Sequence, residues 1–93
     1  MSDKFKIAET SSFQKNINIL KYNKLYPKIK EYMYPILRKN PYFGPNIKRL
    51  KGKLAGIYRY RIGDYRLFYE IDEEKIIIFI IDIEGRKDAY TKK

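Results

Sequence analysis

Polar and apolar side chains alternate strictly along residues 58–62, a pattern that predicts a β-strand. Successive side chains of a strand point to opposite faces, so Arg59 and Arg61 share one face. The other face carries the apolar positions, which are Tyr58, Tyr60 and Ile62. We therefore expect the two arginines to project from a sheet whose opposite face packs its aromatic residues in the core.

Gly63 and Asp64 follow directly and supply a two-residue turn. A loop that opens with glycine suits the primed hairpin turns, in which a positive φ at the first central residue matches the twist of both strands. Residues 65–69 then form the partner strand, with its tyrosines in the packed layer. Arg66 returns on this strand near the first two arginines. The hairpin thus predicts a face with three arginines, an arrangement that suits phosphate.

The N-terminal third predicts one strand and one helix. Residues 4–9 alternate polar and apolar side chains and indicate a first strand at the edge of the sheet. Thr10 and the two serines after it offer an N-cap for a helix. Apolar residues follow at helical spacing, at Phe13, Ile17 and Leu20. We expect this helix to end near residues 21–23.

A second helix is predicted to begin near Pro27, which fits a first helical turn. Its apolar stripe consists of Leu25, Ile29, Met33, Ile36 and Leu37. The Asn40-Pro41 pair is its stop signal. Pro35 lies inside the stripe, where it removes a hydrogen bond and clashes with the preceding turn. We therefore expect a kink there, or two shorter helices.

Residues 42–56 predict a loop anchored by three apolar side chains, Ile47, Leu50 and Leu54. Residues 72–75 form a polar turn, and residues 76–81 are apolar on both faces, as in the central strand of a sheet. The order of elements is therefore β-α-α-β-β-β. We predict an α+β fold in which residues 1–93 form a single domain, with two N-terminal helices packed on a small, mainly antiparallel, twisted sheet.

The composition narrows the chemistry that is possible. The 93 residues suffice for one compact domain, and neither cysteine nor histidine occurs. Without cysteine, disulfides and thiolate metal sites are excluded. Without histidine as well, a metal ion could be bound only by carboxylates. We expect neither a metal nor a cofactor. The N-terminus lacks an export signal, and the longest apolar run is too short to span a bilayer. We expect a cytoplasmic protein without a membrane partner.

The net charge of +10 predicts an anionic partner. Residues 1–56 carry 13 basic and 3 acidic side chains, whereas residues 57–93 carry 8 of each and are expected to sort them by face. Basic side chains interleaved with aromatic ones favour nucleic acid. The candidate contacts to an RNA backbone are Lys48, Arg49, Lys51 and Lys53. The alternative is a solvated, lysine-rich surface without a specific ligand.

These elements and motifs together resemble the RelE/ParE superfamily of bacterial toxins along almost the whole chain. The resemblance is carried by residues 47–52, 58–62, 64–69 and 82–90. It implies a RelE-like fold and a type II toxin-antitoxin pair. For the RelE branch it implies an mRNA endonuclease whose partners are mRNA and ribosomal RNA in the ribosomal A site. An antitoxin neutralises such an endonuclease by covering its basic surface. The ParE branch instead poisons DNA gyrase.

The resemblance also implies a metal-independent site, in which the RNA 2′-hydroxyl attacks the adjacent phosphate. Arg66 and Arg86 fall where family members carry catalytic arginines, and Arg59 and Arg61 fall at basic hairpin positions. Guanidinium groups stay protonated, so they suit charge stabilisation and binding better than proton abstraction. Tyr90 matches the family's terminal tyrosine, which can stack on a base or assist proton transfer. Lys87 is a further expected RNA contact.

The sequence departs from the family pattern at Gly85, where several cleaving members carry a histidine. The general base is therefore open. Glu70 shares strand parity with Arg66 and can serve as the base if it is partly buried, or it can pair with that arginine structurally. The two acids that flank the tail arginine, Glu84 and Asp88, are expected to be charge partners.

Three functions stay open at this stage. The favoured one is a ribosome-dependent mRNA endonuclease whose protein partner is a cognate antitoxin. A gyrase-poisoning toxin without nuclease activity is the second. A basic RNA-binding module that has lost its catalytic apparatus is the third, and the missing histidine favours it.

Overall fold

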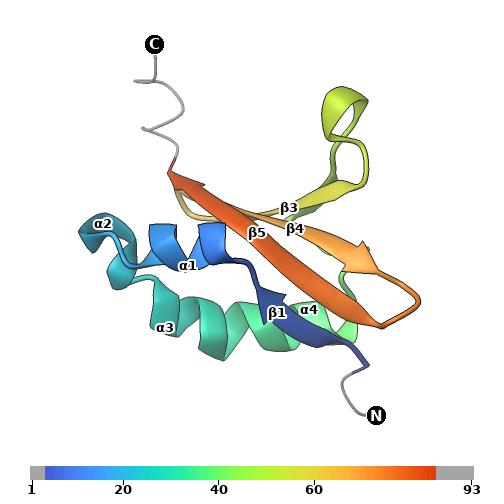
Figure 1. Ribbon diagram of the computed structural model, residues 1–93, viewed down its shortest axis with the longest axis horizontal. Coiled ribbons are helices and arrows are strands. Elements are labelled where there is room, and N and C mark those ends of the chain that lie inside the picture. Colours follow the sequence, from blue (N-terminus) through green and yellow to red (C-terminus); the bar gives the residue numbers. More distant parts are fainter. Residues whose placement is uncertain (1–3, 86–93) are drawn as a thin grey trace.

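The computed structural model describes residues 4–85, apart from the side chains of Leu20 and Lys21, and contains a five-stranded sheet with helices on one face (Figure 1). The spatial order of the strands is β1-β5-β4-β3-β2. Their bounds are β1 Lys6–Glu9, β2 Ile47–Arg49, β3 Ile57–Ile62, β4 Tyr65–Asp72 and β5 Ile77–Gly85. β1 pairs with β5 in parallel, and every other pairing is antiparallel. The predicted α+β fold with a mainly antiparallel sheet is confirmed.

Three strand predictions need correction. β2 lies inside the predicted loop at 42–56, where its three residues are too few to show a period. The apolar strand, β5, is an interior strand between β1 and β4, but β4 occupies the centre of the sheet. β5 also continues to Gly85, beyond the predicted end at residue 81.

The first helical segment begins as expected and ends early. Thr10 caps α1 (Ser11–Ile17), because its hydroxyl oxygen accepts a hydrogen bond of 3.2 Å from the Phe13 N–H. The chain then breaks at residues 18–19 and resumes as the short α2 (Leu20–Asn23). The predicted single helix is therefore two pieces. No helix in the described part of the chain is long and apolar enough to cross a membrane.

The second helical segment accommodates Pro35 by widening a turn. α3 (Tyr26–Lys28) leads into a π-helical segment, Ile29–Met33, and then into α4 (Tyr34–Lys39). The Tyr34 N–H bonds to the carbonyl of Ile29, five residues back. A π turn moves the backbone away from the proline ring, which would clash with a regular α-helical carbonyl. The sequence predicted a kink there or two shorter helices; the helical segment runs on through Pro35 and carries a π bulge.

The core lies between the helices and one face of the sheet. The buried side chains on the sheet are Tyr60, Leu67, Tyr69, Ile78, Ile80 and Ile83, and those on the helices include Phe13, Ile17, Ile29, Met33 and Leu37. Tyr69 is fully buried and donates a hydrogen bond of 2.7 Å to the Pro41 carbonyl. Tyr58 stacks on Tyr69 with ring centroids 5.5 Å apart. The expectation that the hairpin tyrosines pack in the core is met at Tyr60 and Tyr69.

A shared carboxylate ties β1 to the second helical segment. Glu9 accepts hydrogen bonds from the hydroxyls of Tyr26, at 2.7 Å, and Tyr34, at 2.8 Å. Burial, followed by these bonds to Glu9, raises the pKa of Tyr26 to about 12 and raises the pKa of Tyr34 further. Both phenols are therefore held in their neutral, donating form.

Candidate nucleic-acid interface

The β3–β4 hairpin carries its three arginines on the sheet face that the helices leave open. Arg61 lies directly opposite Arg66, and Arg59 lies opposite Phe68. Residues that face each other across a strand pair share a face, and the neighbours of these residues, Tyr60 and Leu67, are buried on the helix side. The predicted gathering of three arginines on one face is thus present in the structure.

The turn sets this register. Gly63 has a φ of +55°, and Asp64 has a negative φ, as in a type II′ turn. This turn follows the right-handed twist of the strands, so the pairing begins at once with Ile62 opposite Tyr65. The next pair inward is that of Arg61 and Arg66.

Arg59 carries a buried guanidinium donor. It is half-buried, and its Nε–H is buried without a hydrogen-bond partner among the described residues. An unpaired buried donor is costly, and more so when it belongs to a charged group. A phosphate oxygen or another anionic acceptor from outside the described chain would satisfy it. Arg66 is half-buried as well, and Arg61 is exposed.

A β-bulge brings two carboxylates onto the same face. Ile78 and Ile80 point into the core, but the register shifts beside Phe68 and Tyr69, so that Ile83 is the next core residue of β5. The side chains beyond the bulge that face outward are those of Asp82, opposite Phe68, and Glu84, opposite Arg66. The expectation that the second half sorts its charges by face is therefore wrong.

These two carboxylates differ in their surroundings. Asp82 is held in place, because its Oδ1 accepts hydrogen bonds from the side-chain amide of Asn16 and from the Ile83 N–H. Glu84 is half-buried and is the direct cross-strand neighbour of Arg66. Glu84, which the sequence predicted to be a charge partner of the tail arginine, thus faces Arg66 of the hairpin.

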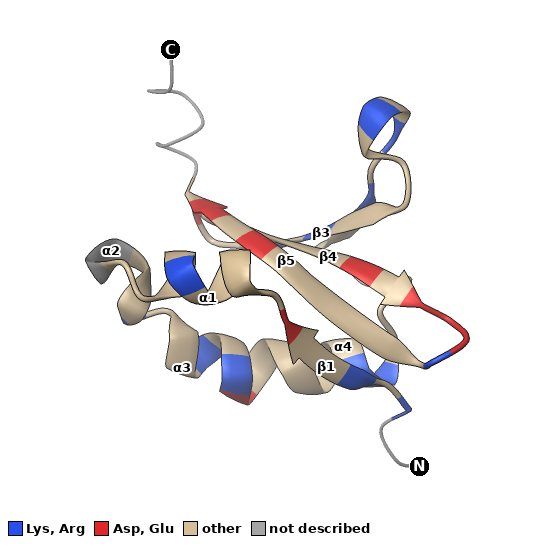
Figure 2. Ribbon diagram, in the orientation of Figure 1, with Lys and Arg blue, Asp and Glu red and all other residues tan. Residues whose placement is uncertain are grey.

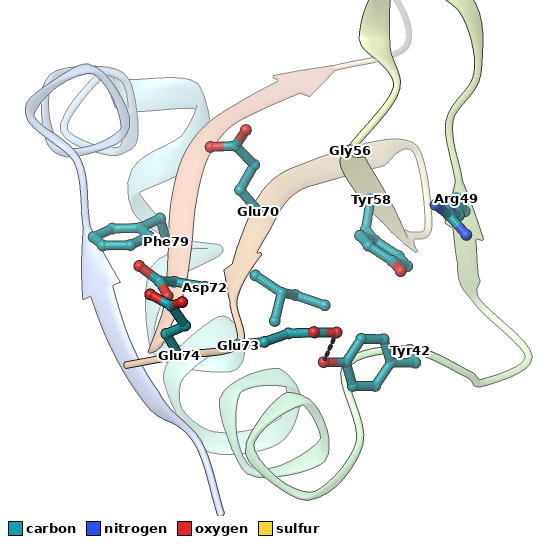
Figure 3. A pocket seen from close by; sticks show the side chains of 10 residues that line it. Tyr42, Arg49, Gly56, Tyr58, Glu70, Asp72, Glu73, Glu74 and Phe79 are labelled. Carbon is teal, nitrogen blue, oxygen red and sulfur yellow. Dashed lines mark hydrogen bonds between the residues drawn. The ribbon is translucent and has the colours of Figure 1, made fainter. Parts of the chain in front are cut away.

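Glu70 lies away from the arginines. It sits four residues along β4 from Arg66, a backbone separation of about 13 Å, and faces Ile57 and Phe79. It is exposed, so the partial burial that a base role required is not observed. Its carboxylate lines a separate cavity of about 530 Å³ that also holds Asp72, Glu73 and Glu74 (Figure 3).

The four basic candidates that follow the helices do not share one face of the sheet. Lys48 pairs with Arg59 and shares its face, whereas Arg49 pairs with Tyr58 and points to the other side. Arg49 lines the acidic cavity beside Tyr42 and Tyr58 (Figure 3). The remaining two, Lys51 and Lys53, are exposed on the loop that rises from the sheet on the side away from the helices (Figure 2).

The predicted tail residues lie outside the described residues. They are Arg86, Lys87, Asp88 and Tyr90. The last described residue, Gly85, is buried, and its N–H donates a hydrogen bond of 3.0 Å to the Tyr22 hydroxyl. Tyr22 also packs edge-on against Tyr65. The end of β5 is therefore fixed against α2 at the residue that precedes Arg86 in the sequence.

One feature of the open face was missed from the sequence. A cavity of about 230 Å³ lies next to the arginines, with Phe68 and Glu84 among its walls. Strand alternation places Phe68 on the arginine face, so the signal was present in the sequence. Glu84 carried no such signal, because its face depends on the bulge.

Comparison with known proteins gives the family. A family model described as the ParE toxin of the type II toxin-antitoxin system parDE matches residues 11–90. Toxin RelG of Mycobacterium tuberculosis is 40% identical over 45 residues, which are 48% of this chain and 52% of that protein. The chain thus spans about half the length of this curated relative.

Solved structures show the same fold. The RelBE2 toxin-antitoxin complex from M. tuberculosis contains a chain that matches with a TM-score of 0.75 and 25% identity, over 89% of this chain and 99% of that one. The YoeB-YefM toxin-antitoxin complex from Staphylococcus aureus matches with a TM-score of 0.64 and 26% identity, over 84% and 92%. With the family model matching most of its length, the chain belongs to the ParE toxin family of type II toxin-antitoxin systems, within the RelE/ParE superfamily that its motifs indicated.

Proposed function

We propose that this toxin is a metal-independent, ribosome-dependent mRNA endonuclease. The observation that carries the proposal is the convergence of Arg59, Arg61 and Arg66 from two adjacent strands on one open sheet face. Phosphate is the ligand that such a cluster of paired donors fits best. The buried, unpaired Nε–H of Arg59 adds a donor that needs an acceptor from outside the described residues.

The proposed reaction transfers the phosphate between two oxygens of the RNA itself. The 2′-hydroxyl loses its proton and attacks the adjacent phosphorus, and the 5′-oxygen of the next nucleotide leaves and takes a proton. The products are a 2′,3′-cyclic phosphate and a 5′-hydroxyl. The arginines stabilise the negative charge that develops on the phosphate oxygens, which is usually the largest catalytic effect. Arg86 and Tyr90 stay proposed members of this site, and the base stays unassigned.

We also propose a cognate antitoxin as the protein partner. The M. tuberculosis and S. aureus structures that this chain resembles are toxin-antitoxin complexes. An antitoxin that blocks the open face of this chain would present acidic side chains to its arginines. The net charge of +10 favours such a partner electrostatically.

The test is cleavage of mRNA on programmed ribosomes by the toxin freed of its antitoxin, followed by primer extension. We expect Arg61→Ala and Arg66→Ala each to lower the cleavage rate about 100-fold, the usual effect of removing one donor to developing charge. Arg49→Ala is the matched control, since it removes a basic residue from the opposite face. Intact transcripts at a high toxin concentration, or equal losses in all three variants, would refute the nuclease proposal.

Gyrase poisoning is the second candidate, because the matching family model carries the description of a ParE toxin. It predicts that the toxin stabilises cleavage complexes between gyrase and DNA and leaves transcripts intact. A decayed RNA-binding module predicts neither effect, only RNA binding that weakens as salt rises. Assays of the antitoxin-free toxin with programmed ribosomes, with gyrase and DNA, and with RNA distinguish the nuclease, the gyrase poison and the RNA-binding module.

A further inference from the structure

We infer that the apolar cavity beside the arginines is a base-recognition pocket that takes a nucleobase with an exocyclic amino group and discriminates against uracil. The inference rests on the proposed function, because it assumes that single-stranded RNA crosses this face. It adds a base preference that the arginine cluster by itself does not supply, since phosphate contacts carry no sequence information.

The pocket has apolar walls of the size of a base. It is a cavity of about 230 Å³ between the sheet and the loop that follows β2. The loop contributes two leucines and the sheet contributes Phe68, and the complete lining is Leu50, Leu54, Ile57, Phe68, Ile81, Asp82 and Glu84. A half-buried phenylalanine on the arginine face offers a stacking surface, which suits an unpaired base.

The pocket lies one step along the sheet from the arginines. Phe68 is the cross-strand partner of Arg59, and the next pair on the same face, Arg61 and Arg66, is about 7 Å further along. The backbone of one nucleotide can cover this distance. A phosphate held by the arginine pair therefore leaves the neighbouring base within reach of Phe68.

The two carboxylates of the pocket supply selectivity. Glu84 and Asp82 offer hydrogen-bond acceptors beside the apolar walls, and Asp82 is held rigidly by Asn16. The amino groups of cytosine, adenine and guanine donate to such acceptors, whereas the O4 of uracil would face a carboxylate as a second acceptor. The carboxylates also repel phosphate, which directs the RNA backbone to the arginines and the base to the pocket.

An apolar side chain of the antitoxin is the competing occupant. An antitoxin that answers a charge of +10 is rich in acidic side chains, and these would meet Glu84 and Asp82 at the mouth of the pocket. The carboxylate acceptors of Glu84 and Asp82 in the pocket lining favour a ligand that brings hydrogen-bond donors. The observations therefore favour the base.

The test measures binding of short single-stranded RNAs that differ at one position, cytosine against uracil, by fluorescence anisotropy with the antitoxin-free toxin. We expect the wild type to bind the cytosine RNA about 10-fold more tightly. Glu84→Gln should reduce this ratio to about 2-fold or less, because the amide can turn its NH₂ group toward the uracil oxygen. Phe68→Leu should weaken binding of both RNAs about 10-fold, through the loss of stacking, without altering the salt dependence.

Phe43→Leu is the control, since Phe43 is 79% exposed and lies outside the pocket. If Phe68→Leu proves unstable, Leu54→Ser tests the loop wall instead, because Leu54 is 50% exposed. Tight RNA binding with equal affinity for both bases, unaffected by Phe68→Leu, overturns the pocket and leaves the proposed function standing. Loss of antitoxin binding alone in Phe68→Leu assigns the pocket to the antitoxin and also overturns the inference. Failure of the wild type to bind any RNA removes the proposed function and the pocket together.

Discussion

Hydrogen-bonded tyrosine hydroxyls fix several elements of this protein in place. Tyr69 donates to the carbonyl of Pro41, and Tyr26 and Tyr34 donate to the carboxylate of Glu9. Each hydroxyl connects a strand to the helical segment or to the chain that leaves it. A phenol engaged in this way is unavailable for stacking on RNA, so Phe68 is the aromatic side chain of the described part of β4 that the arginine face can offer.

Removal of the Tyr69 hydroxyl should destabilise the protein. In Tyr69→Phe the ring still fills the core, but the buried Pro41 carbonyl loses its donor, which costs about 1–3 kcal/mol. Urea denaturation followed by circular dichroism measures the change. Tyr32→Phe is the control, because Tyr32 is 65% exposed, and its free energy of unfolding should equal that of the wild type. Equal stability of both variants would show that the Tyr69 bond contributes nothing.

Alkaline pH should also destabilise the fold. Folding raises the pKa of Tyr26 to about 12, through burial and the hydrogen bond to Glu9, and raises the pKa of Tyr34 for the same reasons. The folded state therefore keeps protons that the unfolded state loses near pH 10, so their contribution is complete below pH 10 and falls as pH rises further. Each phenol contributes a slope of at most about 1.4 kcal/mol per pH unit.

Urea denaturation at a series of pH values between about 8 and 12 tests this prediction. Tyr34→Phe removes one of the two phenols and should flatten the decline above pH 10, relative to the wild type. Tyr32→Phe, on the exposed face, should leave the slope as it is. A slope that is identical in Tyr34→Phe and in the wild type would contradict the role assigned to Glu9.

At the level of elements, the hairpin could be predicted from the sequence and the placement of its charged neighbours could not. Alternation and a Gly-Asp turn are local signals, and they correctly placed Arg59, Arg61 and Arg66 on one face. The face of Glu84 depends on a bulge that exists only in the pairing of β4 with β5. Parity with the core residues Ile78 and Ile80 would have placed it on the wrong side.

The placement of Lys48 and Arg49 on opposite faces also depends on strand pairing that the local sequence does not reveal. β2 is three residues long and is defined by its pairing with β3, so its own sequence gave no period to read. Without that pairing, Lys48 and Arg49 looked equivalent. The pairing sends them to opposite faces of the sheet. The tail residues of the candidate site, including Arg86 and Tyr90, stay predictions.

The turn of the hairpin offers a prediction at this scale. Gly63→Ala should lower the free energy of unfolding by about 1 kcal/mol, because its φ of +55° strains an L-residue. Beyond the two chain neighbours, no heavy atom lies within 4 Å of an added Cβ, so the cost is confined to the local backbone. Gly63→Asn should cost less, since asparagine tolerates positive φ. Thermal denaturation ranks the three proteins, and a stability of Gly63→Ala equal to that of the wild type would contradict the turn geometry.

For the whole molecule, charge opposes compactness. A net charge of +10 on 93 residues favours the unfolded chain through self-repulsion. Raising the ionic strength from about 0.01 M to about 0.15 M shortens the Debye length from about 30 Å to about 8 Å. We therefore expect the melting temperature to rise over this range of sodium chloride, and to rise more when a polyanion binds the arginine face. A melting temperature that falls with added salt would show that attractive ion pairs dominate instead.

The parallel pairing of β1 with β5 has a consequence for synthesis of the protein. Lys6 finds its partner only at Ile77, and the capping Thr10 bonds to the Ile80 carbonyl. Contacts this distant in sequence form late, so a nascent chain must expose residues 77–80 outside the ribosomal exit tunnel before its first strand has a strand partner. The sheet of this toxin is therefore expected to close only after residues 77–80 have left the tunnel.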